Sequence, residues 1–220
     1  MQKFATTAPV TAVLDIPAGR VQLIAADRSD VTVEVRPVNA SKSRDVKAAE
    51  RTTIAYDDGV LRVVNPGGDQ HFGPSGSIEV TVQLPAGSRV EVKAQAAELR
   101  AVGRLGDLVF DGAYRHVKVD EAAGLRLAAT DGDVEVTRLT GPGDISTARG
   151  DITVAEATGG KLTLTTQSGD ITVTAAAGVS AALDAGTSHG RVTNSLKNDG
   201  TTTLDIRATT RQGDITARSN

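Results

Sequence analysis

A repeated unit of strand, Gly-Asp turn and strand between Leu125 and Val173 most constrains how this chain can fold. The unit occurs three times there, as DGDVEV, RGDITV and SGDITV. Glycine supplies the positive-φ corner of such a turn, and aspartate hydrogen-bonds backbone N–H groups two residues further on. We therefore expect structural turns at Gly132-Asp133, Gly150-Asp151, Gly169-Asp170 and Gly213-Asp214, with Gly106-Asp107 as an earlier copy and Gly190-Arg191 as a variant.

The spacing of apolar residues predicts stacked coils. Inward-pointing positions follow one another at intervals of nine or ten residues at Leu125, Val134, Gly143, Ile152, Leu162 and Ile171. Similar turns recur about every twenty residues, which is typical of a β-solenoid. A β-sandwich of hairpins also gives a strand every 8–12 residues or so. The solenoid is favoured, because a sandwich has no reason to repeat one turn in register.

The first 77 residues predict a β-rich part that packs continuously with the repeats. Alternating segments at 10–14, 20–25 and 31–35 indicate strands, and 52–56 and 60–64 indicate a hairpin across Asp57-Asp58-Gly59. Residues 41–51 are charged and predict a loop or a short helix. We expect one all-β domain over 1–220, with the repeats at 78–220.

The segment 65–77 is the most loop-like part of the sequence, with four glycines and two prolines in 13 residues. It contains His71 and Phe72, which are rare residue types in this chain. We favour a surface connection whose Phe packs onto the sheet. The alternative is a contact site formed by His71 and Phe72 on a binding loop.

Composition excludes several classes of function. The net charge is -3, so no global field attracts nucleic acid or anionic lipid. There is no cysteine, the three histidines are far apart, and aromatic residues are 2% of the chain. These counts disfavour zinc sites and stacking surfaces for sugars or single-stranded nucleic acid. Residues 1–19 lack a signal-peptide pattern and no apolar run could span a membrane, so we expect a cytoplasmic protein.

The repeated Gly-Asp-Ile-x-Val units, the segment LDIPAGRVQLIAAD and the block SIEVTVQLPAGSRVEVKAQAAELRAVGRLGDL resemble the bacterial DUF4097 family, often labelled "putative adhesin". The resemblance covers essentially the whole chain, and the ending GDITARS is similar to actinobacterial members. It implies a right-handed β-solenoid of unknown biochemical role. Its motif is structural and carries over no catalytic residue.

The stacked turns are the first candidate for chemistry. Asp133, Asp151, Asp170 and Asp214 would lie about 5 Å apart, the spacing of neighbouring strands. Like charges at that distance repel, so either each carboxylate is hydrogen-bonded within its own turn or cations such as calcium bridge them. We favour the hydrogen bonds, because the leading double glycine of calcium-binding repeats is missing.

No side chains in the sequence indicate catalysis, and we predict no catalytic, cofactor-binding or metal-binding residue. A carbohydrate-active β-helix enzyme would need a carboxylate pair beside a sugar platform, and the platform is absent. His116 and His189 are interpreted as surface or turn residues. Ser188 beside His189 is no nucleophile–base pair, because such a pair is defined by geometry across the fold.

The ends of the solenoid are the remaining candidate, because an uncapped end exposes unpaired strand edges. Residues 1–64 are long enough to form a cap, which argues against a filament. The last predicted strand, Asp214–Ala217, has little chain after it. We favour an edge blunted by Arg218; the alternative is end-to-end association, with Ile215 and Thr216 as candidate interaction residues at an open edge. We expect a monomer or weak homodimer. The predicted function is a non-enzymatic scaffold or module that binds a protein, not nucleic acid or membrane; the alternative is an exported adhesin-like protein.

Overall fold

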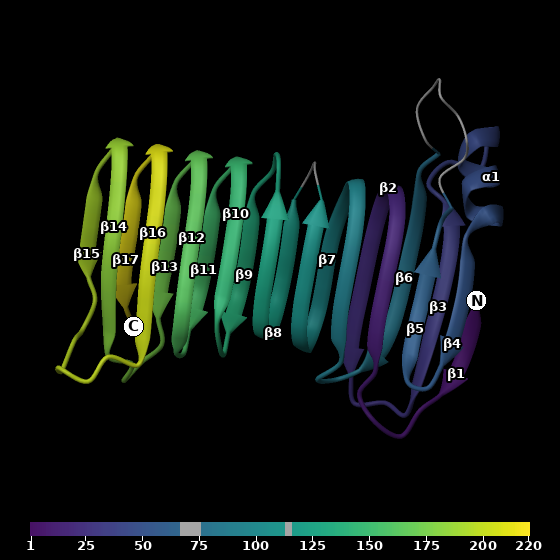
Figure 1. Cartoon of the computed structure of the whole chain (residues 1–220), viewed down its shortest axis with the longest axis horizontal. Coiled ribbons are helices and arrows are strands. Elements are labelled where there is room, and N and C mark those ends of the chain that lie inside the picture. The colour runs from purple at the N-terminus through teal and green to yellow at the C-terminus, as the bar shows by residue number, and fades with distance from the viewer. Residues whose placement is uncertain (67–75, 113–115) are drawn as a thin grey trace. The chain divides into compact units, whose positions relative to one another are not determined.

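The computed structural model describes residues 1–66, 76–112 and 116–220 (Figure 1). Two compact units make up the chain, unit 1 from Met1 to Arg115 and unit 2 from His116 to Asn220. Both consist almost entirely of strands, which confirms the all-β prediction. The predicted contact residues His71 and Phe72 lie outside the described residues.

The elements of unit 1 are one helix and seven strands within the described chain: β1 (Gln2–Ala5), β2 (Thr11–Ala26), β3 (Asp30–Pro37), α1 (Ser43–Arg51), β4 (Thr53–Asp57), β5 (Val60–Val64), β6 (Ile78–Pro85) and β7 (Arg89–Gly112). Those of unit 2, which is described throughout, are β8 (Val117–Ala129), β9 (Val134–Leu139), β10 (Gly143–Arg149), β11 (Ile152–Ala157), β12 (Gly160–Ser168), β13 (Ile171–Ala175), β14 (Ala181–His189), β15 (Val192–Ser195), β16 (Leu204–Gln212) and β17 (Ile215–Ser219).

Unit 2 is a β-solenoid with two strands in each coil. The strands form two walls, and every pairing between neighbours is parallel. The first half of β8 is followed in space by β9, β11, β13, β17 and β15, which we call wall A. The second half of β8 is followed by β10, β12, β16 and β14, which we call wall B. The repeat in the sequence thus builds the predicted solenoid.

The core of unit 2 consists of in-register rows of aliphatic side chains. Val134, Ile152, Ile171 and Ile215 form one row of wall A, and each is 0% exposed. Alternation along each strand sends the next residue outward, as the half-buried or exposed threonines show. Burying such rows removes apolar surface from water on every coil, and this is the main stabilising term of the stack.

The last coil along the chain is not the last coil in space. β16 and β17 lie between the β12–β13 coil and the β14–β15 coil (Figure 1). The chain passes β13, forms the outermost coil, and returns through residues 196–203 to fill the place beside β12 and β13. Our prediction of an open edge at Asp214–Ala217 is therefore wrong, because β17 is paired on both sides.

Unit 1 uses the same principle with its N-terminal segment. β2 is long and bends at Gly19, so its first half lies between β5 and β7 and its second half between β6 and β7. These pairings are parallel, so coils begin well before residue 78. The predicted 52–64 hairpin is confirmed, with β4 and β5 antiparallel across Asp58 and Gly59, both at positive φ.

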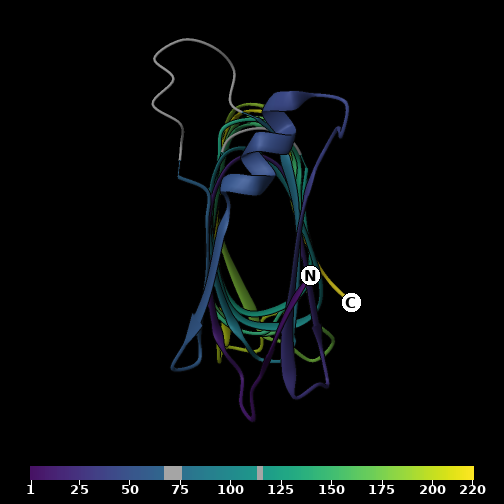
Figure 2. The same ribbon diagram turned by 90° about the vertical axis from the view of Figure 1, so that its right-hand side faces the viewer.

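A helix and an aromatic pair close one end of unit 1. The charged segment at 41–51 forms α1, which contacts β3 and β6 and lies over the upper part of this end in Figure 2. Asp45 and Ala48 are the buried residues of the helix, and the Asp45 carboxylate accepts a 3.0 Å hydrogen bond from Ser77 N–H. Phe4 of β1 and Tyr56 of β4 stack with ring centroids 5.0 Å apart. The edge strands β1 and β4 run antiparallel to their neighbours β3 and β5.

Candidate functional site

The Gly-Asp turns of unit 2 require glycine for two separate reasons. Gly132, Gly150, Gly169 and Gly213 have φ of 124°, 132°, 151° and 143°, which side-chain-bearing residues rarely adopt. A Cβ on Gly150 would also lie 2.2 Å from the carbonyl oxygen of Gly132 in the neighbouring coil. The turns therefore stack backbone on backbone, and this close stacking accounts for their repetition in the sequence.

The aspartates of these turns bond to the neighbouring coil. The Asp133 carboxylate accepts a hydrogen bond from Asp151 N–H at 2.9 Å, Asp151 accepts from Asp170 N–H at 2.8 Å, and Asp170 accepts from Asp214 N–H at 2.7 Å. This corrects the expected bond within each aspartate's own turn. In the stack, the N–H of the aspartate in the neighbouring coil lies within hydrogen-bonding distance of each carboxylate, so the aspartates link coils to one another.

Three threonine hydroxyls add a second link between coils that the sequence analysis missed; Thr166 and Thr210 are buried and Thr187 is half-buried. The hydroxyls of Thr166, Thr210 and Thr187 donate to the carbonyl oxygens of Gly150, Gly169 and Gly213 at 3.0 to 3.1 Å. Each threonine lies three residues before a turn glycine, at an inward position of wall B. That recurrent spacing in TTQSG, TTRQG and TSHG could have indicated it.

The ladder of turns ends at Arg191. Asp214 accepts from Arg191 N–H at 2.9 Å, and its other oxygen lies 3.0 Å from the Arg191 guanidinium. The N–H first, and the guanidinium second, lower the pKa of the Asp214 carboxyl below its ordinary value. Arg191 replaces the aspartate of the other turns, so its side chain offers no acceptor to a further coil.

The outermost coil, β14 and β15 with the turn at 190–191, is the end coil, and its apolar side chains are incompletely covered. Val192 is in register with Ile215 but is 45% exposed, whereas Ile215 is 0% exposed. Leu183 is in register with the buried Ile206 and is only half-buried. In the part of the chain that the structure describes, no element lies over these side chains, so the core of unit 2 ends open.

The backbone of the end coil is also open on one side. β14 pairs with β16 and β15 pairs with β17, and on their other sides the described chain provides no strand. At the start of β14, the open-side N–H of Ala181 donates to Lys197 O at 2.9 Å, so the open edge begins after Ala181. Ser180 O accepts from Leu204 N–H and Arg191 O accepts from Ile215 N–H, so these carbonyls face the neighbouring strands β16 and β17. Alternation then points the N–H groups of Leu183 and Ala185, and of Val192 and Asn194, toward the open side. Such groups form a template for another strand.

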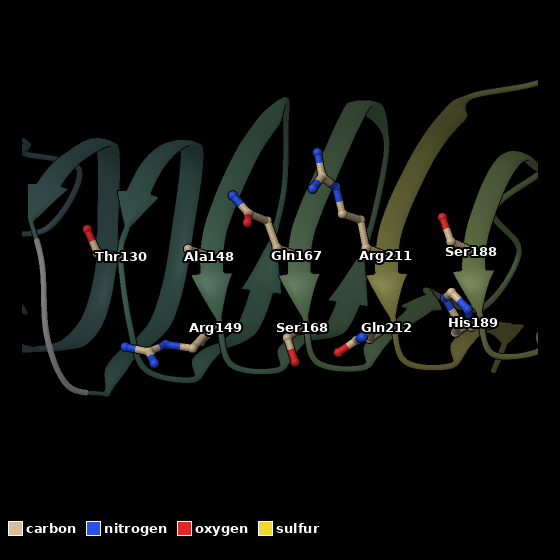
Figure 3. Close-up of a pocket in the computed structure, with 9 residues that line it drawn as sticks. All are labelled: Thr130, Ala148, Arg149, Gln167, Ser168, Ser188, His189, Arg211 and Gln212. Carbon is tan, nitrogen blue, oxygen red and sulfur yellow. The ribbon is translucent and has the colours of Figure 1, made fainter.

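A shallow groove of about 650 Å³ crosses wall B near the turns and reaches the end coil (Figure 3). Its lining comes from successive strands in two rows and contains hydroxyl, amide, guanidinium and imidazole groups but no carboxylate: Thr130, Ala148, Arg149, Gln167, Ser168, Ser188, His189, Arg211 and Gln212. The Arg149 guanidinium is 2.6 Å from the Asp131 carboxylate. Groups of this kind can bind a polar ligand, but the groove shows no nucleophile held by a base.

The other predicted residues are not brought together. Ile215 is fully buried and Thr216 is half-buried within a strand that is paired on both sides. His116 is 71% exposed with Nδ1 3.6 Å from the Asp133 carboxylate, and His189 lies exposed in the groove. Among the described residues no group of three or more His, Asp or Glu side chains could hold a metal ion. Searched over the same residues, no helix has the length and apolar character to cross a membrane.

Comparison with known proteins agrees with this architecture. The profile of Toastrack DUF4097 matches residues 94–218, more than half of the chain. A solved structure of a "putative adhesin" from Bacteroides fragilis is 14% identical, with a TM-score of 0.57, over 98% of this chain and 95% of that one. That likeness shows the fold.

Two further structures come from Parabacteroides distasonis. A "putative adhesin" is 15% identical with a TM-score of 0.47, and a "putative lipid binding protein" is 11% identical with a TM-score of 0.45. Each alignment covers 98% of this chain and 95% of the other. No curated protein matches the chain. On the extent of the profile match and the β-solenoid architecture, the chain belongs to the Toastrack DUF4097 family.

Proposed function

We propose that this protein is a non-enzymatic binding module that recognises another protein through the end coil of unit 2. The single observation that carries the proposal is the open end itself. There the N–H groups of Ala185 and Asn194 face away from the stack, and Val192 is 45% exposed at the end of an otherwise buried row. An exposed edge with apolar side chains beside it is the surface to which proteins add a strand.

Two features of unit 2 support a role in binding rather than catalysis. The turn aspartates each accept a backbone N–H, so their repetition is explained by stacking. His189 and Ser188 are consecutive residues of one strand that both line the groove, and their side chains point away from each other (Figure 3). The repeats thus serve as a rigid support that presents the end coil.

The chain has no cysteine, so one introduced thiol gives a unique attachment point. Asn194→Cys places it on the end coil, and Thr137→Cys places it on an exposed outward position of β9 as the matched control. Each protein is labelled with a photoreactive, thiol-linked cross-linker and incubated with an extract of the native cells. We expect a discrete protein adduct from Asn194→Cys and none from Thr137→Cys. Equal adducts from both positions, or none from Asn194→Cys, would overturn the proposal.

An adhesin on the cell surface is the second candidate function. It is favoured by the name of the similar structure from Bacteroides fragilis. Both candidates use a binding surface, but they differ in location. Fractionation of native cells separates them: most of the protein at the surface or in the medium supports the adhesin, and most of it inside supports an intracellular module.

A further inference from the structure

The two strands of the end coil are arranged so that they can complement a second copy of themselves. β14 and β15 belong to opposite walls and run in opposite directions (Figure 1). In each strand, the residues whose side chains point into the core also carry the N–H groups that face the open side. Ala185 is such a residue in β14, where it is in register with the buried Ala208, and Asn194 is such a residue in β15, where it is in register with the buried Ala217.

We infer that unit 2 binds a second copy of this chain end to end, about a two-fold axis parallel to the strands. This inference rests on the proposed function and names the partner. Such an axis places β14 of one copy beside β15 of the other in both walls at once, and the paired strands are antiparallel. Two-fold symmetry is the commonest in homo-oligomers and needs one self-complementary surface.

The side chains fit this arrangement as well as the backbone does. The two-fold axis places β14 beside the partner's β15 with the core-facing side chains of both strands on the same face of the joined wall. Leu183 and Val192 of each copy then meet their counterparts at the junction, where the half-open cores become continuous. Removing this apolar surface from water supplies a driving force in addition to the backbone hydrogen bonds.

Stacking of a further coil in the same direction as the others is disfavoured. Each earlier turn offers an aspartate carboxylate to the N–H of the next coil, as Asp170 does to Asp214. The end turn has Arg191 in that place, and its guanidinium is directed at Asp214. A head-to-tail filament would leave the turn N–H of each added coil without this acceptor. The antiparallel two-fold contact does not use the turn.

The expected association is weak because the new ladders are short. β15 has four residues, so each of the two walls gains only a few hydrogen bonds. Interfaces below about 1,200 Å² are typical of transient complexes. A dimer in equilibrium with monomer across the micromolar range is therefore the predicted state.

The test measures molar mass by sedimentation equilibrium over a range of protein concentrations. The double variant Ala185→Pro with Asn194→Pro removes two open-side N–H groups, and Ala185→Ser with Asn194→Ser keeps them. We expect the serine protein to dimerise like wild type and the proline protein to have a dissociation constant at least about tenfold higher, since one lost hydrogen bond amounts to roughly that factor. Circular dichroism confirms that both variants are folded. Equal dimerisation of both folded variants would overturn the inference.

Cross-linking provides a second readout that does not depend on proline. Thr187→Cys and Asn194→Cys are prepared as separate proteins, oxidised alone and then oxidised after mixing. The two-fold axis places position 187 of one copy near position 194 of the other, so the mixture should form a disulfide dimer faster than either protein alone. A dimer formed as fast by Asn194→Cys alone would place β15 against β15 and contradict the axis.

The two proposals can fail separately. If wild type is monomeric at every concentration while Asn194→Cys still gives an end-specific adduct with another protein, the second copy is wrong and the binding end remains. If there is neither a dimer nor an end-specific adduct, both proposals are wrong. A dimer that depends on the open-side N–H groups supports both.

Discussion

One end of unit 1 and the end coil of unit 2 are both ends of a stack of strands, but only the end of unit 1 is covered by other elements. In unit 1, antiparallel edge strands, helix α1 and the Phe4–Tyr56 stack lie over the last parallel coil. In unit 2, the last coil has no such cover among residues 116–220, and Val192 is the exposed end of a buried row. An edge strand invites association unless it is covered or blunted. The covered end of unit 1 needs no partner to protect its edges, and the open end of unit 2 is where we propose that a partner binds.

The largest effect is expected from proline at two consecutive positions of β14. Gly186 directs its N–H toward β16 and Ala185 directs its N–H toward the open side, by the alternation of a parallel strand. Gly186→Pro should lower the free energy of unfolding by about 2–4 kcal/mol, because a ladder hydrogen bond is lost within the fold. Ala185→Pro should cost less than about 1 kcal/mol. Urea denaturation measures both, and equal losses would show that β14 is not an edge.

The next effect comes from one substitution made at two positions of the same row. Val134 is 0% exposed and Val192 is 45% exposed. Val134→Ala should cost about 2–3 kcal/mol, through lost burial and a residual cavity. Val192→Ala should cost below about 0.5 kcal/mol in the monomer, because water already reaches that side chain. Thermal unfolding of dilute protein compares them, and a similar cost at Val192 would mean that the end coil is covered.

The cap of unit 1 should show the opposite behaviour from the open end. Phe4→Ala removes a ring stacked at 5.0 Å on Tyr56 and should cost about 1–2 kcal/mol. A double-mutant cycle with Tyr56→Ala should give a coupling of roughly 0.5–1.5 kcal/mol. If no coupling is measured, the contact between the two rings does not stabilise this end of unit 1.

The smallest effect is expected in the turn ladder. Asp170→Ala leaves Asp214 N–H without its carboxylate acceptor and should cost about 1 kcal/mol, since water can partly replace an exposed acceptor. Added calcium should leave the melting temperature of the wild type unchanged, because these carboxylates already accept backbone N–H groups. A calcium-dependent rise would instead indicate an ion bound to the folded state.

The repeat made the solenoid predictable, but not the order of its coils. Both coils after β13 present inward apolar residues in register with the coils beside them, so the period of apolar residues does not say which of the two lies outermost. The sequence does mark the end coil by longer intervals between successive inward-pointing residues. Ile171 to Leu183 is 12 residues and Val192 to Ile206 is 14, whereas nine or ten is usual between Leu125 and Ile171. These irregular intervals flank the end coil.

The identity of the end coil could also have been read from its turn. Gly190-Arg191 is the variant in which the aspartate is missing, and an aspartate is needed only where another coil follows. The role of the aspartate as a link between coils could not be predicted from the turn itself, because its bond to the backbone connects residues that are 18 to 44 positions apart. The bond exists only once the coils have stacked.

Hydrogen exchange at two alanines tests the open end most directly. Ala185 of β14 and Ala208 of β16 are in register, and the same alternation points the N–H of Ala208 into the β14–β16 ladder and that of Ala185 to the open side. In protein dilute enough to be monomeric, we expect rapid exchange at Ala185 and strong protection at Ala208. Protection of Ala185 equal to that of Ala208 in the dilute monomer would contradict it, because the edge would then already be paired.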